Sequence, residues 1–299
     1  MDLTISKFLR YIALEKRYSP NTIESYSTDL TQFEKYLKEL SDGHDIFWQK
    51  LDKRYVRHFL MELQEQGLNK RSIARKVATL KSFFRFLEKQ EIVEQSIASA
   101  IKMPKFDNKL PEFLTKIEIE KIVNLPDLST FEGIRDKAIL ELFYSCGLRL
   151  SELITLKTEN LMLREDAVRV IGKGRKERIL PVGKHARNAL LRYLDYRKKL
   201  ARPGVQEIFI LESGKAMYPM SVQRLIKKYI NMVVSISSAS PHILRHSYAT
   251  HLLDSGANIR VVKDLLGHEN LSTTQVYTHL SIDHLKNVYK SAHPGAKNK

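Results

Sequence analysis

The sequence has little of what secreted or membrane proteins need. Cys146 is the only cysteine, so the chain cannot form an internal disulfide, and a reducing compartment suits such a chain. No apolar run approaches the ~18 residues that a membrane span requires. The segment MDLTISKFLRYIALEKR alternates charged with apolar residues, whereas a signal peptide has an apolar centre. We therefore expect a cytoplasmic protein that does not insert into membranes.

Negative charge is also scarce. The chain has 34 Asp and Glu against 50 Lys and Arg, a formal net charge of +16. The segment 164–202 concentrates the excess, with 13 basic and 4 acidic residues. A solvated basic surface is the ordinary explanation, but so local an excess favours a face that binds a polyanion such as nucleic acid.

The chain is long enough for two hydrophobic cores, and its pattern divides it accordingly. Residues 1–105 read as helices: Ser19 followed by Pro20 is typical of a helix start, and the apolar positions of 69–90 recur at helical spacing. Residues 106–112 lie in a stretch with prolines and no periodicity, which indicates a linker. Residues 113–299 form the second predicted domain, which starts with a capping-box pattern at Thr115 and Glu118.

The second domain is expected to be mostly helical with one β-hairpin. The words AVRVI and ERILPV flank a Gly-Lys-Gly turn, and two β-type runs around such a turn predict a hairpin. Three short helices follow, starting at Ser240 with Pro241, at Asn258 and at Ser272. The predicted fold is thus mainly α with a small β-hairpin or sheet (α+β), in two domains.

Polar residues of the second domain fall in five short motifs. YSCGLRLSEL, GKGRK, HILRH, LLGHEN and STTQVYTH contribute, in this order, Arg149, Lys173, His242 with Arg245, His268 and Tyr277. Taken singly, each has an ordinary explanation: a surface arginine, a loop lysine, a polar patch, a helix-end histidine or a core tyrosine. Their combination is what indicates a site.

The ordered set Arg, Lys, His-x-x-Arg, His, Tyr resembles the tyrosine recombinase (integrase) family. The longer words GLRLSEL, GKGRKERILPV, SPHILRHSYATHLL and LLGHENLSTTQVYTH resemble its bacterial Xer branch. The resemblance covers nearly the whole chain. It implies a C-shaped clamp around DNA, made of an N-terminal helical core-binding (SAM-like) domain and a C-terminal catalytic domain.

The resemblance also implies roles for the motif residues. Tyr277 would be the nucleophile, forming a 3′-phosphotyrosyl intermediate and a free 5′-hydroxyl, with no need for ATP. Arg149 and Arg245 would stabilise the pentavalent phosphorus, because guanidinium groups are permanently cationic and bind phosphate oxygens in a fork. Lys173 would protonate the departing 5′-oxygen. His242 suits general acid–base work and His268 a hydrogen bond to the scissile phosphate.

A metal site is not expected. His242 and His246 have a spacing that permits shared metal binding, but no glutamate accompanies them as in HExxH, and the arginines would repel a cation. We expect no cofactor. Further contacts to DNA phosphates are predicted for basic residues of the helix in 69–90 and of the hairpin turn: Lys70, Arg71, Arg75, Lys76, Lys81, Arg85, Arg175 and Lys176.

The expected function is site-specific recombination through a Holliday junction, with chromosome dimer resolution as the favoured task. The partners would be a dif-like double-stranded DNA site, a homo- or hetero-tetramer with a related recombinase, and a division-associated DNA translocase. A mobile-element integrase or excisionase and a catalytically silent DNA-binding protein remain alternatives. A type IB topoisomerase-like activity fits the two-part layout less well, and RNA binding lacks an aromatic recognition motif.

Overall fold

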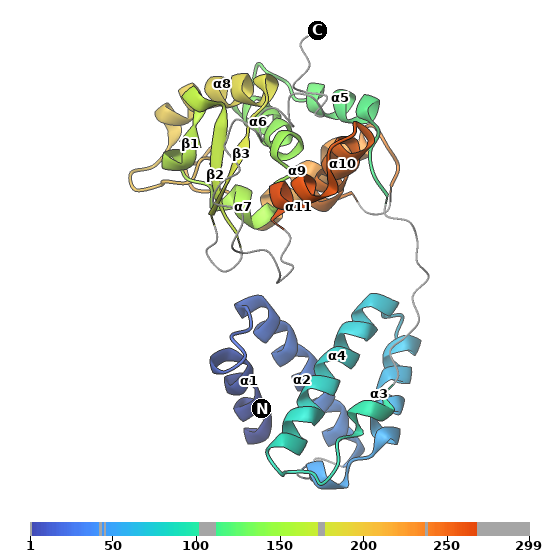
Figure 1. Cartoon of the computed structure of the whole chain (residues 1–299). Helices are drawn as coiled ribbons and strands as arrows, with labels where there is room; N and C mark the ends of the chain where they lie inside the picture. Colours follow the sequence, from blue (N-terminus) through green and yellow to red (C-terminus); the bar gives the residue numbers. More distant parts are fainter. Residues whose placement is uncertain are drawn as a thin grey trace. The chain divides into compact units, whose positions relative to one another are not determined.

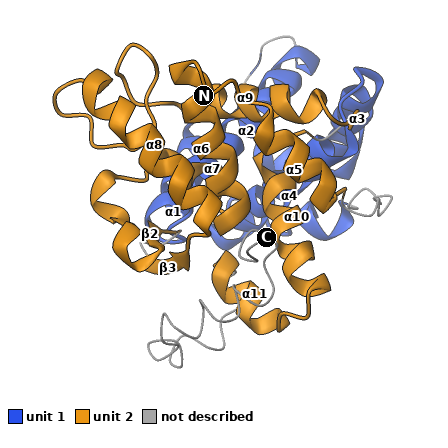
Figure 2. Ribbon diagram, turned by 90° about the horizontal axis from the view of Figure 1, so that it is seen from above, with its two compact units in different colours: residues 1–109 blue, residues 110–299 orange. Residues whose placement is uncertain are grey.

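The chain folds into two compact units, Met1–Lys109 and Leu110–Lys299 (Figures 1 and 2). The computed structural model describes residues 2–41, 44, 46–101, 112–172, 177–236 and 239–267. Lys173, Arg175, Lys176, His268 and Tyr277 therefore lie outside the described residues, as does the helix predicted at Ser272.

The first unit is helical throughout its described residues. Its elements are α1 (Leu3–Leu14), α2 (Pro20–Leu40), η1 (Trp48–Lys50), α3 (Lys53–Glu65), α4 (Lys70–Lys89) and η2 (Ile97–Ala100). The Ser19 hydroxyl caps α2 by accepting from the Thr22 N–H, as the sequence predicts. The apolar positions of α4 are buried in a core rich in aromatic rings, among them Phe8, Phe33 and Phe83. Aromatic packing of this kind supplies much of a small core's burial.

The second unit packs helices around α6. Its helices are α5 (Lys116–Asn124), α6 (Phe131–Cys146), α7 (Leu150–Ile154), η3 (Thr158–Asn160), η4 (Leu163–Glu165), α8 (Lys184–Leu200), α9 (Pro219–Asn231), α10 (Pro241–Asp254) and α11 (Ile259–Leu266). Nearly every residue of α6 is buried, including both charged and apolar side chains. A helix buried on all sides lies at the centre of its domain, and α5, α8 and α10 pack against it.

A small antiparallel sheet lies beside these helices. It consists of β1 (Leu161–Met162), β2 (Ala167–Ile171) and β3 (Glu177–Pro181), in the order β1-β2-β3. Val168 lies opposite Leu180, so two buried apolar side chains share the inner face. The predicted hairpin and the mainly α fold are confirmed. β1 was not predicted, because two residues are too few to show an alternating pattern.

Helix ends in the second unit follow the predicted signals. The capping box at Thr115 and Glu118 forms, with both hydrogen bonds present. Asn258 caps α11, which ends at Gly267 in the left-handed region (φ 63°). Ser240 and Pro241 begin α10, although the Ser240 side chain makes no capping bond. In the described ranges we find no helix that combines the length and apolar character of a membrane span.

Candidate active site

A sharp turn between α6 and α7 places Arg149. Gly147 ends α6 with φ 58°, and the chain then turns into α7, of which Arg149 is the N-cap residue. A Cβ on Gly147 would lie 2.4 Å from the Tyr248 ring of α10. Both the left-handed backbone and this close approach require glycine. The turn therefore places Arg149 where α6, α7 and α10 meet.

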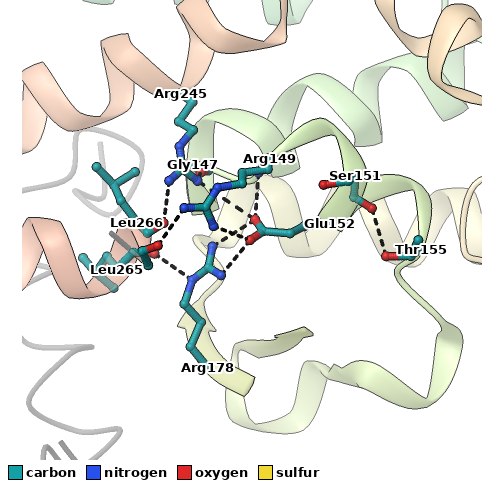
Figure 3. A network of polar contacts seen from close by, with 10 residues as sticks. Gly147, Arg149, Ser151, Glu152, Thr155, Arg178, Arg245, Leu265 and Leu266 are labelled. Carbon is teal, nitrogen blue, oxygen red and sulfur yellow. Dashed lines mark hydrogen bonds and ion pairs between the residues drawn. The ribbon is translucent and has the colours of Figure 1, made fainter. Parts of the chain in front are cut away.

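Glu152 on α7 is the centre of the site (Figure 3). Its side chain is only 2% exposed, and its carboxylate accepts from Arg149 Nη1 at 2.9 Å. Arg178 on β3 donates to both of its oxygens, from Nη1 at 2.8 Å and Nη2 at 2.9 Å. Arg245 Nη1 lies 4.0 Å from Oε2. One buried carboxylate thus neighbours three guanidinium groups, which come from α7, β3 and α10.

The same three arginines also hold the C-terminal end of α11. Arg178 Nε donates to the Leu265 carbonyl at 3.0 Å, and Arg149 Nη2 donates to the Gly267 carbonyl at 2.6 Å. Arg245 Nη2 donates to the carbonyl between them, that of Leu266. The last carbonyls of a helix have no partner within it and carry a partial negative charge. Three consecutive carbonyls are therefore capped by three side chains (Figure 3).

Arg245 is more buried than Arg149. Its Nη1 also donates to the Gly147 carbonyl at 2.6 Å, and its side chain is 10% exposed against 32% for Arg149. Burial and the charge of Arg149 lower the pKa of the Arg245 guanidinium to about 10. Arg245 thus remains cationic at neutral pH.

Burial alone would raise the pKa of the Glu152 carboxyl. Hydrogen bonds from Arg178 and Arg149, with the charge of Arg178, instead hold its pKa below the ordinary value. The carboxylate is therefore ionised at neutral pH. Among the described residues, three guanidinium charges against one carboxylate leave the cluster positive even after the helix end is counted. Such a partly buried cationic cluster is suited to bind an anion.

His242 lies on the same helix as Arg245, one turn earlier. It is the second residue of α10 and is exposed. Residues three apart lie on one face of a helix, so the structure places both on one side of α10. The other histidines of this helix have packing roles: His246 faces the Phe113 ring, and His251 is buried with its Nδ1 3.0 Å from the Tyr144 hydroxyl.

Glu152 and Arg178 were not among the site residues predicted from the sequence. Glu152 stands three residues after Arg149, where its carboxylate also accepts the Arg149 backbone N–H at 2.8 Å. This spacing is the second half of a capping box and could have been noticed. Arg178 follows the basic hairpin turn and looks like one more surface cation. Its partners come from α7 and α11, which no local pattern connects to β3.

The basic residues predicted on α4 do not share one environment. Lys70, Arg71, Arg75 and Arg85 are exposed and Lys81 is half-buried. Lys76 is buried, and its Nζ lies 2.8 Å from a carboxylate oxygen of the buried Asp29. A lysine enclosed with its counter-ion has no surface to offer to a phosphate. We therefore replace its predicted DNA contact by a role inside the core of the first unit.

Known proteins resemble both units. Residues 112–284 match the phage integrase family, and residues 5–91 match the phage integrase N-terminal SAM-like domain. A curated relative named tyrosine recombinase XerC from Chlorobaculum parvum is 37% identical over 98% of this chain and 94% of its own length. Another of that name, from Bacillus licheniformis, is 39% identical over 98% and 96%.

Solved structures agree in fold. The post-cleavage complex of the XerH site-specific recombinase with a palindromic difH substrate has a TM-score of 0.73 at 22% identity, covering 96% of this chain and 94% of that one. A λ integrase dimer bound to a COC′ core site has a TM-score of 0.70 at 17% identity, covering 90% and 96%. The chain therefore belongs to the phage integrase family, as a tyrosine recombinase of the Xer type that carries out site-specific recombination.

Proposed function

We propose that the arginine cluster around Glu152 binds the scissile phosphate of a DNA recombination site. The supporting observation is the imbalance of charge in the described part of the site, where Arg149, Arg178 and Arg245 surround a single carboxylate. Arg149 and Arg245 each use two nitrogens on protein acceptors and keep further N–H groups of the five that a guanidinium has. Those groups bind the non-bridging oxygens.

Tyr277 supplies the nucleophile in this proposal. Its phenolic oxygen attacks phosphorus, the bond to the 5′-oxygen breaks, and the products are a 3′-phosphotyrosyl ester and a 5′-hydroxyl. The phenol has an ordinary pKa of ~10, so its proton must pass to a neighbouring base. Rejoining reverses these steps with the 5′-hydroxyl of the partner strand. The ester conserves the energy of the broken bond, so neither ATP nor a metal takes part.

The remaining motif residues move protons and orient the phosphate. Lys173 protonates the departing 5′-oxygen, His242 acts in general acid–base catalysis, and His268 donates a hydrogen bond to the phosphate. Arg149 and Arg245 are held by carbonyls before substrate arrives, so the charge that develops on the non-bridging oxygens meets fixed donors. Preorganised donors of this kind contribute on the order of 10²–10³ each in rate.

The first unit acts as the core-binding domain and residues 113–299 as the catalytic domain. The exposed basic side chains of α4 support this assignment, because sequence-independent affinity for DNA comes largely from phosphate neutralisation. Arg71, Arg75 and Arg85 are exposed on this helix. Together with Lys70, Lys81, Arg175 and Lys176 they contact the DNA backbone, and Lys76 does not.

The biological task is chromosome dimer resolution. The chain matches relatives named tyrosine recombinase XerC over nearly their full length, which supports a housekeeping recombinase over a mobile-element integrase. Its partners are a dif-like duplex and three further recombinase subunits, identical or related, that form a tetramer on two sites. A division-associated DNA translocase controls the reaction.

Covalent trapping tests the chemistry. The labelled duplex carries a candidate recombination site and a nick a few nucleotides from the scissile phosphate, so that the short 5′-hydroxyl fragment diffuses away. The protein should form a DNA adduct that survives a denaturing gel. Tyr277→Phe should bind equally in a native gel and form none. Tyr196→Phe, which alters an exposed tyrosine of α8, is the matched control and should trap normally.

Two results would overturn the proposal. Adduct formation by Tyr277→Phe would place the nucleophile elsewhere. The second is that the unaltered protein binds its cognate sites tightly, with its partner recombinase present, and forms no adduct on any of them. That result would show a catalytically silent DNA-binding protein.

A further inference from the structure

Arg178 connects three segments of the catalytic unit that are distant in sequence. It stands on β3, its Nη1 and Nη2 donate to the two oxygens of Glu152 on α7, and its Nε donates to the Leu265 carbonyl of α11. Each segment is close in sequence to a residue of the proposed chemistry: β3 begins four residues after Lys173, α7 begins directly after Arg149, and α11 ends two residues before His268. Arg178 is thus the common partner of these segments (Figure 3).

The contacts of Arg178 are directed into the protein. Its side chain is 15% exposed, and three of the five N–H groups of its guanidinium are committed to Glu152 and Leu265. A fork of two parallel hydrogen bonds fixes a carboxylate in position and orientation. Arg178 is therefore built to hold Glu152, whereas Arg149 and Arg245 each commit two nitrogens to protein acceptors and keep more N–H groups for a ligand.

We propose that Arg178 is a positioning residue for the recombination reaction, acting on the scissile phosphate through Glu152 and the end of α11. The inference rests on the proposed function of Arg149 and Arg245. Glu152, fixed by Arg178, sets the guanidinium of Arg149. The α11 carbonyls, one of them held by Arg178, set the outer nitrogens of Arg149 and Arg245.

Loss of Arg178 changes the charge balance of the site as well as its geometry. Of its described cationic neighbours, Glu152 would keep Arg149 and Arg245, so its full charge would compete with the phosphate for them. The Leu265 carbonyl would lose its donor. Lysine cannot replace these contacts, because an ammonium group is a point charge without the planar fork. Both Arg178→Ala and Arg178→Lys should therefore displace the phosphate-binding arginines.

Single-turnover cleavage of the nicked duplex, at protein concentrations that saturate the DNA, measures this effect. Arg178→Ala should cleave about 10–100-fold more slowly, the size expected when catalytic groups shift by about 1 Å. Arg178→Lys should recover only part of the rate. Native-gel affinity should remain near that of the unaltered protein. Arg54→Ala is the matched control, since Arg54 also pairs with a carboxylate, that of Asp52, but is exposed.

A second substrate separates positioning from a general loss of structure. A methylphosphonate at the scissile position replaces one charged non-bridging oxygen by a methyl group. Arginines that stabilise this charge contribute less on such a substrate, so Arg178→Ala should slow its cleavage by a much smaller factor, about threefold or less. A damaged fold would slow both substrates by the same factor. Thermal unfolding of both Arg178 variants identifies those that are folded at the assay temperature.

The outcomes are distinct. A slower rate on the phosphate with near-normal rate on the methylphosphonate supports the proposal. An unchanged rate in folded Arg178→Ala overturns it, and so does an equal loss on both substrates. The unaltered protein must first form the adduct, which is the test of the proposed function itself. A failure there is therefore distinguishable from a failure of the Arg178 inference.

Discussion

The Tyr248 ring lies so close to Gly147 that a Cβ on the glycine would come within 2.4 Å of the ring's Cδ1. Tyr248 is fully buried on α10, and Gly147 ends α6 in the left-handed region. The Gly147 carbonyl in turn accepts from Arg245 Nη1. The contact therefore fixes the distance between the helix that carries Arg245 and the turn that carries Arg149.

Gly147→Ala should destabilise the catalytic unit and slow cleavage. The methyl group would force the ring or the helix to move, which costs about 1–3 kcal/mol for overpacking, and alanine would be strained at φ 58°. Chemical denaturation measures the loss of stability. Gly204→Ala is the control, because φ there is 83° but a Cβ would meet nothing within 4 Å. If both variants lose the same stability, backbone strain alone explains the effect.

Glu152→Gln should weaken the site and change how stability depends on pH. The pKa of Glu152 is lowered in the folded state, so its ionised form stabilises the fold above its unfolded pKa of about 4.3. That contribution is lost as the pH falls through the lower folded pKa. Glutamine cannot titrate, so the variant should be less stable at pH 6 and lose less on acidification. Thermal unfolding between pH 6 and pH 3 checks this, and an unaltered acid limb would contradict it.

The sequence was sufficient for the elements whose signals are local. Ser19, Thr115 and Asn258 mark helix starts where the structure has them, because a cap bonds to backbone only two or three residues away. The hairpin strands were also found, since alternation and a glycine-rich turn are local as well. The motifs shared with the tyrosine recombinase family then indicated that Arg149 and Arg245 belong to one site.

The parts that were missed depend on contacts across the chain. Arg178 meets Leu265 from 87 positions away, and nothing in the alternation of β3 distinguishes it from a surface arginine. Lys76 was misjudged for the same reason: it lies among exposed cations in sequence, but its counter-ion Asp29 is 47 positions earlier. Burial of a charge follows from where its partner folds, which a local pattern does not contain.

Lys76→Met should affect the stability of the protein, whereas Arg71→Ala should affect its binding to DNA. Asp29 is fully buried, and Lys76 is one of its partners beside Arg75 and Thr79. Lys76→Met should therefore lower stability by about 1.5–3 kcal/mol, the value of a hydrogen bond to a charged group. Binding by the folded variant should keep the salt dependence of the unaltered protein. Arg71→Ala should leave stability nearly unchanged and reduce the slope of log K against log salt by about 1. Salt titrations of DNA binding and denaturation curves, measured for both variants, check these predictions. A reduced slope in Lys76→Met would show that Lys76 does contact a DNA phosphate.

Arg245→Lys should remove most of the cleavage activity while preserving DNA binding. Arg245 reaches two carbonyls at once, those of Gly147 and Leu266, and still keeps N–H groups for a phosphate. A lysine ammonium has three donors around a single atom and cannot span both carbonyls. We expect a loss on the order of 10²–10³ in the single-turnover rate, as for a preorganised donor. Arg260→Lys is the matched control, because it makes the same substitution at an exposed position of α11. If Arg245→Lys cleaved at the rate of the unaltered protein, a positive charge at this position would be sufficient for cleavage. The contact between residue 245 and the end of α11 would then not be needed to orient a phosphate-binding donor.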